Sequence, residues 1–269
     1  MPIHYEEPED HLVVIRIDRP EKRNALDLYH FRDLAAAWRR FGGDPEAWVA
    51  IVTGTDGSFF AGADLKTYIP QVTELQQRIA SGEVTEIDGC RLSDGTYAVL
   101  RNVKLFKPVI AAVDGPCVAG GMELLGGVDI RLATPRSTFG VLEPRRGLFA
   151  GGGTTVRLVR QIAFPAAMEL LLTAEAVSAE RALSMGLLNE LVGEDELMER
   201  ALDWAHRILA NGPLAVQATK ESVMRGLALD LEAAYRLEQE LATKVFSSED
   251  AKEGPRAFSE KRPPAWKGR

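Results

Sequence analysis

Cysteine is scarce in this sequence. Only Cys90 and Cys117 occur among 269 residues, and neither belongs to a CxxC pair or a cysteine–histidine cluster. A disulfide framework needs more cysteines than this, and a structural zinc site needs clustered ligands. We therefore expect two reduced thiols, buried or half-buried, in a protein of a reducing compartment.

Long apolar runs and a surplus of positive charge are also missing. No segment approaches the roughly 20 apolar residues that a membrane-spanning helix needs, and the N-terminal MPIHYEEPEDHLVV is acidic, unlike a secretory signal. The net charge of −7 argues against a general affinity for nucleic acid or anionic membranes. The sequence thus predicts a cytoplasmic protein with no nucleic-acid or membrane partner, while a local basic patch for a phosphate-bearing ligand is still open.

Common catalytic signatures are absent too. None of the four histidines lies near a glycine-rich turn, and the chain has no GxSxG, HExxH or Walker A motif and no GxGxxG after a strand. Serine–histidine catalysis, zinc hydrolysis and Rossmann dinucleotide binding therefore lack their usual sequence patterns.

What the first part of the chain does contain is an alternation of strand and helix patterns. Short apolar, β-branched runs predict strands at residues 11–18, 48–54, 108–115 and 128–133. Apolar residues spaced by three and four between Leu28 and Phe41 predict a helix, with Asp27 as its N-cap and Gly42-Gly43 as its end. Strand, helix, strand in this order indicates an α/β fold with a largely parallel sheet.

After Ser178 the pattern becomes helical. Helices are expected at residues 179–185, 194–210, 213–225 and 231–245. We therefore divide the chain into an α/β core of residues 1–190 and a helical C-terminal subdomain of residues 191–269.

Two glycine-bearing turns follow predicted strands. The first is GSFFAGADLK at 57–66, and the second is DGPCVAGGMELL at 114–125. Small residues let a ligand approach the backbone, and Gly120 and Gly121 lie where a helix would begin, so that free amides face outward. Two such turns on neighbouring strands could each donate one N–H to a single oxygen, as an oxyanion hole does. The alternative is that the small residues only permit tight packing.

Two glutamates accompany these turns. Glu123 lies in the first turn of the glycine-opened helix, where an acidic residue is often only a partner of the helix dipole. Glu143 follows the 128–133 strand and could be a solvated loop acid or an ion-pair partner of Arg145 or Arg146. If both reach the same edge of the sheet, they could carry out acid–base chemistry on a shared water.

Seven segments together resemble the enoyl-CoA hydratase/isomerase (crotonase) family in order and spacing. They are RPEKRNALD, FFAGADLK, KPVIAAVDGPCVAGGMEL, VDIRLAT, FGVLEPRRGL, SAERALSMGLLNELV and SSEDAKEGPRAFSEKRPPAW. The resemblance runs from about Asp18 to the C-terminus. It implies a ββα spiral core with a helical C-terminal part used in forming trimers or dimers of trimers.

The resemblance also implies roles for individual residues. Ala63 and Gly120 match the oxyanion-hole amides, and Glu123 and Glu143 match the catalytic glutamates of the hydratases. The residues implied to contact the acyl-CoA substrate are Lys22, Arg23, Ala25, Ala61, Asp64, Leu65, Lys66 and Gly121. Coenzyme A belongs to the substrate, and no metal or other cofactor is implied.

The sequence departs from the family pattern in four places. Leu142, where a proline is frequent, precedes Glu143, and Pro144 follows it; LFAGGGTT replaces a proline-containing turn. Pro255 should kink or interrupt the terminal helix. The segment between Asp64 and Lys107 is longer than expected. Residues 66–105 combine a helical apolar spacing (Val72, Leu75, Ile79) with a polar, glycine-bearing loop, and we expect this segment to roof the acyl pocket. Changes within residues 81–95 should then alter chain-length preference; the alternative is that the insertion only lies on the surface or at a subunit contact.

Two glutamates favour hydration of a 2-enoyl-CoA, because double-bond isomerisation needs only one acid–base residue. The alternatives are an isomerase, an acyl-CoA hydrolase, or a non-catalytic acyl-CoA binder. A generic nucleotide-binding module is disfavoured by the missing phosphate-binding motif.

Overall fold

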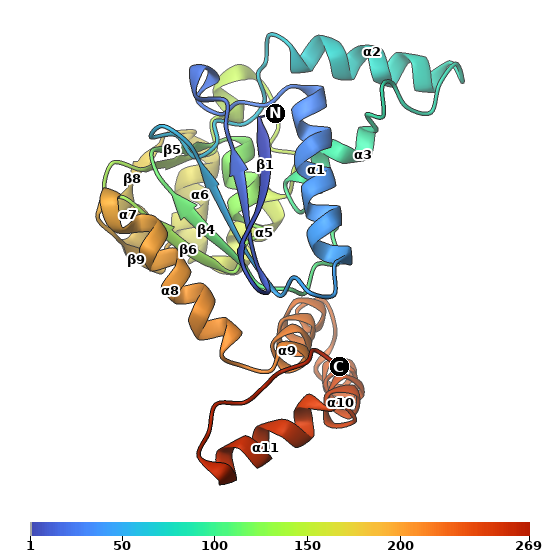
Figure 1. The fold of residues 1–269 in the computed structure, drawn as a ribbon. Coiled ribbons are helices and arrows are strands. Elements are labelled where there is room, and N and C mark those ends of the chain that lie inside the picture. Colours follow the sequence, from blue (N-terminus) through green and yellow to red (C-terminus); the bar gives the residue numbers. More distant parts are fainter. Residues whose placement is uncertain (1) are drawn as a thin grey trace.

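The computed structural model describes residues 2–269, and its centre is a six-stranded sheet (Figure 1). The strand order is β1-β2-β3-β4-β6-β9. The bounds are β1 (Ile3–Glu9), β2 (Leu12–Ile17), β3 (Val49–Gly54), β4 (Val109–Val113), β6 (Ile130–Ala133) and β9 (Glu190–Leu191). From β2 to β9 all neighbours are parallel, whereas β1 pairs antiparallel with β2. The predicted parallel sheet is confirmed, and the antiparallel edge strand β1 was not foreseen.

A second, three-stranded sheet lies beside the first. It contains β5 (Pro116–Val118), β7 (Thr138–Gly140) and β8 (Val177–Ser178), in that spatial order. Between β5 and β6 the chain forms the short helix α4 (Gly120–Leu125). This helix begins at the predicted glycines, so the second glycine-bearing turn leads directly from one sheet into a helix.

Helices cover both faces of the large sheet. Helix α1 (Leu28–Gly43) starts where predicted, because the Asp27 carboxylate accepts hydrogen bonds from the amides of Tyr29 and His30. It buries Trp38 and Phe41 in the main core. Helix α8 (Leu197–Leu209) packs Leu197, Ala201 and Ala205 against the opposite face. Residues after position 190, where the domain boundary was predicted, therefore still pack against the sheet of the α/β core.

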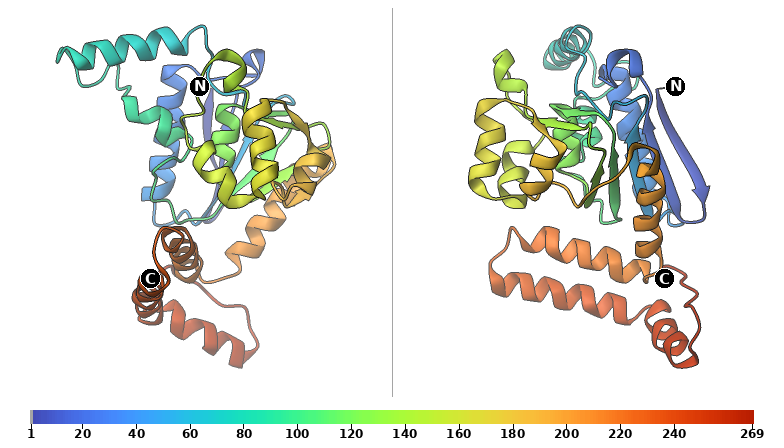
Figure 2. Two further views of the ribbon diagram at one scale, coloured as in Figure 1. Left: turned by 180° about the vertical axis from the view of Figure 1, so that it is seen from behind. Right: turned by 90° about the vertical axis from the view of Figure 1, so that its left-hand side faces the viewer.

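The segment between the two glycine-bearing turns contains two helices, of which the first was expected from its apolar spacing. Helix α2 (Tyr68–Ala80) projects from the body, and α3 (Leu92–Ala98) returns to pack beside α1 (Figures 1 and 2). Later come α5 (Thr154–Gln161), α6 (Phe164–Thr173) and α7 (Ala179–Ser184). Short 3-10 turns, labelled η1 to η3, occur at Pro20–Lys22, Glu143–Arg146 and Glu194–Glu196.

Three C-terminal helices stand apart from the core. They are α9 (Pro213–Gly226), α10 (Leu231–Phe246) and α11 (Asp250–Glu260), and Figure 2 shows α9 and α10 running side by side. The ammonium group of Lys220 on α9 connects them to the core by donating to the Lys107 carbonyl at 2.9 Å and to Asp129 at 2.6 Å. Helix α11 is continuous through Pro255, so the expectation that this proline would interrupt the helix is wrong.

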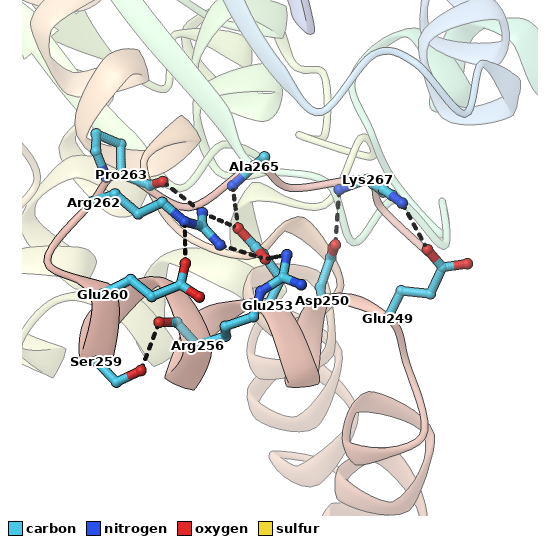
Figure 3. Close-up of polar contacts among 10 residues, drawn as sticks. All are labelled: Glu249, Asp250, Glu253, Arg256, Ser259, Glu260, Arg262, Pro263, Ala265 and Lys267. Carbon is cyan, nitrogen blue, oxygen red and sulfur yellow. Dashed lines mark hydrogen bonds and ion pairs between the residues drawn. The ribbon is translucent and has the colours of Figure 1, made fainter.

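The tail after α11 folds back along that helix (Figure 3). Glu253 accepts hydrogen bonds from Arg256, Arg262 and the amide of Ala265. Asp250 accepts from the amides of Lys267 and Gly268 at 2.8 and 2.9 Å. Two acidic residues of one helix thereby fix the course of the tail. No helix within the described part of the chain has the length and apolarity to cross a bilayer.

Candidate active site

A cavity of about 590 Å³ lies beyond the carboxyl ends of β3 and β4. Its wall comes from the turn after β3, the beginnings of α2 and α4, one face of α3, and residues between Leu142 and Gly152. Glu123 and Glu143 both line it, as do Ala63 and Gly120. The four residues to which the sequence assigns catalytic roles therefore face one space.

The two glycine-bearing turns are in direct backbone contact. A Cβ atom on Gly62 would lie 2.7 Å from the Gly120 nitrogen, and a Cβ on Gly120 would lie 2.9 Å from the Gly62 Cα. Gly62 also has a φ of +86°, which side-chain-bearing residues rarely adopt. Glycine is thus required here because the two turns approach each other closely and because of the backbone conformation at Gly62. The alternative that the small residues permit tight packing therefore explains part of the pattern.

The amides of Ala63 and Gly120 are available to a ligand. Leu26 pairs with this turn by accepting from the Asp64 amide and donating to the Gly62 carbonyl, both at 2.8 Å, so the intervening Ala63 N–H faces away from Leu26. Neither that amide nor the Gly120 amide donates a hydrogen bond to another residue within 2–269. Just before Gly120, Ala119 has a φ of +51°, a strained backbone of the kind concentrated at functional sites.

Glu123 is held by a glycine from a distant part of the chain. The Gly152 amide donates a hydrogen bond to its carboxylate, and a Cβ atom on Gly152 would lie only 2.1 Å from Glu123 Oε2. Burial raises the pKa of Glu123, while the Gly152 hydrogen bond and the charges of Arg101 and Arg157 lower it. The carboxyl group is therefore partly desolvated yet retains partners for its ionised form.

Arg157 anchors the elements around Glu123. Its guanidinium donates to the carbonyls of Val99 and Glu123, at 3.1 and 3.2 Å, and to that of Leu100. These bonds tie α5 to the end of α3 and to the backbone of α4. Arg157 does not bond the Glu123 carboxylate, so it positions the helix and leaves the acid free to face the cavity.

Glu143 is the first residue of the 3-10 turn η2. Its Oε2 atom is buried and has no hydrogen-bond partner within residues 2–269. Burial, with a smaller contribution from the negative charge of Glu123, raises the pKa of Glu143 to about 7. Arg145 instead pairs with Glu175, and Arg146 donates to the Leu142 carbonyl, so a salt-bridge role for Glu143 has no support in these contacts.

The remaining predicted contact residues divide into two groups. Arg23, Ala61 and Leu65 line the cavity. The others do not: Lys22 and Lys66 are exposed, Ala25 is buried, Asp64 pairs with Arg19 at 3.4 Å, and Gly121 packs against the Phe60 carbonyl.

Sequence reasoning missed several residues of the cavity wall. Gly152 was noted only as part of an unusual glycine run, and its contact with Glu123 spans twenty-nine positions. Tyr68, Leu92 and Gly95 come from the 66–105 segment, which was expected to roof the pocket without any of these residues being singled out. The helical spacing of Val72, Leu75 and Ile79 was the available signal for α2, whereas the sequence of α3 gives no comparable apolar spacing.

Comparison with known proteins identifies the family. Residues 7–269 match the family model described as enoyl-CoA hydratase/isomerase. The chain is 39% identical to enoyl-CoA hydratase EchA19 of Mycobacterium tuberculosis, covering 98% of this chain and 96% of the other. It is 36% identical to the (E)-benzylidenesuccinyl-CoA hydratase of Thauera aromatica, with 97% and 98% coverage. A crystal structure of an enoyl-CoA hydratase from Bacillus anthracis superimposes over 100% of both chains, with a TM-score of 0.89 and 32% identity.

Proposed function

This chain belongs to the enoyl-CoA hydratase/isomerase family, and we propose that it adds water across the 2,3 double bond of a 2-enoyl-CoA. The observation that carries this proposal is that Glu123 and Glu143 face one cavity with the unpaired amides of Ala63 and Gly120. A base, an acid and an oxyanion site are what conjugate addition of water requires.

In this proposal the thioester oxygen binds between the Ala63 and Gly120 amides. Attack of water on C3 moves electrons through the conjugated system to that oxygen and forms an enolate. The two N–H groups stabilise its negative charge, and loss of one such donor typically costs about 3–4 kcal/mol of transition-state stabilisation.

The two glutamates divide the proton transfers. Glu123, whose ionised form retains hydrogen-bonding and cationic partners, accepts a proton from the attacking water. Glu143, with a pKa of about 7, donates a proton to C2. One water is consumed, hydroxide joins C3 and a proton joins C2; return of the Glu123 proton to Glu143 through solvent restores the enzyme.

The coenzyme A part of the substrate enters past the exposed rim of the cavity. Arg23 lines the cavity, and Lys22 and Lys66 are exposed in the neighbouring segments. Their positive charges suit the phosphates of the nucleotide. Ala61 and Leu65 would contact the pantetheine arm, while Ala25, Asp64 and Gly121 would support the backbone behind these contacts. No metal participates in this mechanism.

The decisive experiment is an activity screen with 2-enoyl-CoAs of graded chain length, beginning with crotonyl-CoA. Hydration removes the conjugated double bond, so absorbance of the unsaturated thioester should fall and the 3-hydroxyacyl-CoA should form. Glu123→Gln is the matched inactive control, and addition of EDTA should change nothing. Conversion of 3-enoyl-CoAs without hydration would establish an isomerase, release of free CoA a hydrolase, and binding without turnover a non-catalytic binder.

A further inference from the structure

Tyr68 places a phenol hydroxyl in the wall of the cavity. The residue begins α2, and its ring packs against Phe31 with centroids 4.9 Å apart. Its hydroxyl lies against α3, where a Cβ atom on Gly95 would be 2.8 Å away. The influences on the pKa of this phenol are the burial around it and the charge of Glu123, and no hydrogen bond within residues 2–269 is among them. Its hydroxyl is not among the side-chain atoms that the protein encloses completely, so a ligand in the cavity can reach it.

The cavity that this hydroxyl faces combines apolar side chains with the charged groups of Glu123, Glu143 and two arginines. Phe31, Leu65, Ile69 and Leu92 line the same cavity. Thr96, a hydroxyl-bearing residue of α3 in the same wall, already donates to the Ser93 carbonyl at 3.0 Å. Burial, and next the negative charge of Glu123, raise the pKa of Tyr68. The phenol therefore remains neutral at physiological pH and can donate a hydrogen bond.

We propose that Tyr68 determines acyl specificity by donating a hydrogen bond to a neutral oxygen on the substrate's acyl chain. The inference rests on the proposed function, since it assumes that the acyl group occupies this cavity. The preferred substrates would be acyl-CoAs with a hydroxyl or keto substituent beyond C3. A carboxylate is disfavoured because the charge of Glu123 acts on the same space.

The physical reason is the asymmetry of buried hydrogen bonds. An alkyl chain in this cavity displaces water from the Tyr68 hydroxyl and leaves the donor without a partner, whereas an oxygen-bearing chain pairs with it. Sites built around such a donor discriminate against ligands that lack the acceptor. We expect a preference of about 10- to 100-fold at the chain length that matches the position of Tyr68.

Calorimetric binding of saturated acyl-CoAs tests the inference. The probes are 4-oxopentanoyl-, 5-oxohexanoyl- and 6-oxoheptanoyl-CoA, each compared with the methyl-branched acyl-CoA of the same shape. Wild-type protein should bind at least one keto compound about 10-fold or more tightly than its branched counterpart. Tyr68→Phe should bring that ratio near one. Tyr97→Phe, on α3 beneath Arg39 and outside the cavity wall, should leave it unchanged.

Gly95→Ala provides a second variant, because the added methyl group would displace the Tyr68 hydroxyl and should also reduce the ratio. A ratio near one in the wild type at every chain length, or an equal ratio in wild type and Tyr68→Phe, would overturn the inference. A purely structural role for Tyr68 would weaken binding of both members of a pair equally. Saturated acyl-CoAs cannot be hydrated, so this outcome is independent of whether hydration is observed.

Discussion

Glu143 combines a buried, unpaired carboxyl oxygen with a pKa near neutrality. Such a group is poised to exchange a proton with a ligand, and Glu123 across the cavity has partners that favour its ionised form. Different environments thus separate two chemically identical side chains into a candidate acid and a candidate base.

Replacement of either glutamate should affect turnover more than binding. Glu123→Gln and Glu143→Gln preserve side-chain size but remove proton transfer, and each should lower kcat for hydration by about 10²–10⁴-fold. The affinity for CoA should stay nearly unchanged, as measured by calorimetry. Near-complete activity in either variant would show that the replaced residue is not an essential acid or base.

The pH dependence follows from the raised pKa of Glu143. Its protonated form is populated below about pH 7 and is lost as the pH rises through that value. If Glu143 supplies the proton to C2, kcat/KM should decline above about pH 7, approaching tenfold per pH unit. The residual activity of Glu143→Gln should lack this decline. A flat profile between about pH 6 and pH 9 in the wild type would contradict the assignment.

At the scale of elements, the spacing of apolar residues predicted those helices and strands whose burial pattern is visible within the segment itself. Helix α1 was recognisable because its buried residues recur at spacings of three and four. Strands β2, β3, β4 and β6 were recognisable because each is a short, almost continuously buried apolar run. Strand β1 was not, because an edge strand with Glu6, Glu7 and Glu9 exposed lacks an apolar run. The strand conformation of β1 is determined by its antiparallel pairing with β2 and is not evident from its own residues.

The site was predictable to a similar extent. Resemblance to a family placed the two glutamates and the two amides, and their positions in one cavity agree with that placement. The contacts of Gly152 and Tyr68 could not be deduced, because each joins elements far apart in the chain whose distance depends on the complete fold.

The preference for acyl-chain length should depend on α2 and α3, the two helices that flank the loop of residues 81–91. In this region the cavity wall is formed by Tyr68 and Ile69 at the start of α2 and by Leu92, Gly95 and Thr96 of α3, while residues 81–91 contribute none. Leu92→Ala should enlarge the pocket and shift relative kcat/KM toward longer chains by about 10-fold, within the range for one or two methylenes. Assays over a 2-enoyl-CoA series provide the measurement.

Shortening residues 82–89 is the matched control and should leave that profile unchanged. This narrows the broader prediction that any change within residues 81–95 alters chain-length preference. An altered chain-length profile after shortening, in a protein that is still folded, would restore the broader prediction.

For the whole molecule, the C-terminal helices expose much apolar surface. Leu227, Leu231 and Phe246 are 70%, 69% and 78% exposed. Leu237, in the middle of α10, is by contrast buried at 5% exposure. Since many exposed large apolar side chains on the same helices are typical of contact sites, we propose that these helices pack between subunits of a trimer or a dimer of trimers.

Light scattering should therefore give a mass of three or six chains at micromolar concentration. Leu231→Glu would place a charge in the proposed contact and should lower the measured mass. A stable monomer in the wild type would refute the proposed assembly.

The contact between Gly152 and Glu123 restricts the order in which this sequence can change. With a glutamate at position 123, a side chain at position 152 would push the carboxylate out of its present place. Once residue 123 is small, the space at 152 opens and the constraint disappears. The effects of substitutions at the two positions therefore depend on each other. Gly152→Ala should disturb the site when Glu123 is present and should have a much smaller effect on it in a Glu123→Ala background. A lineage that loses the acid first can then accumulate side chains at 152, and each of them blocks reversion to the acid.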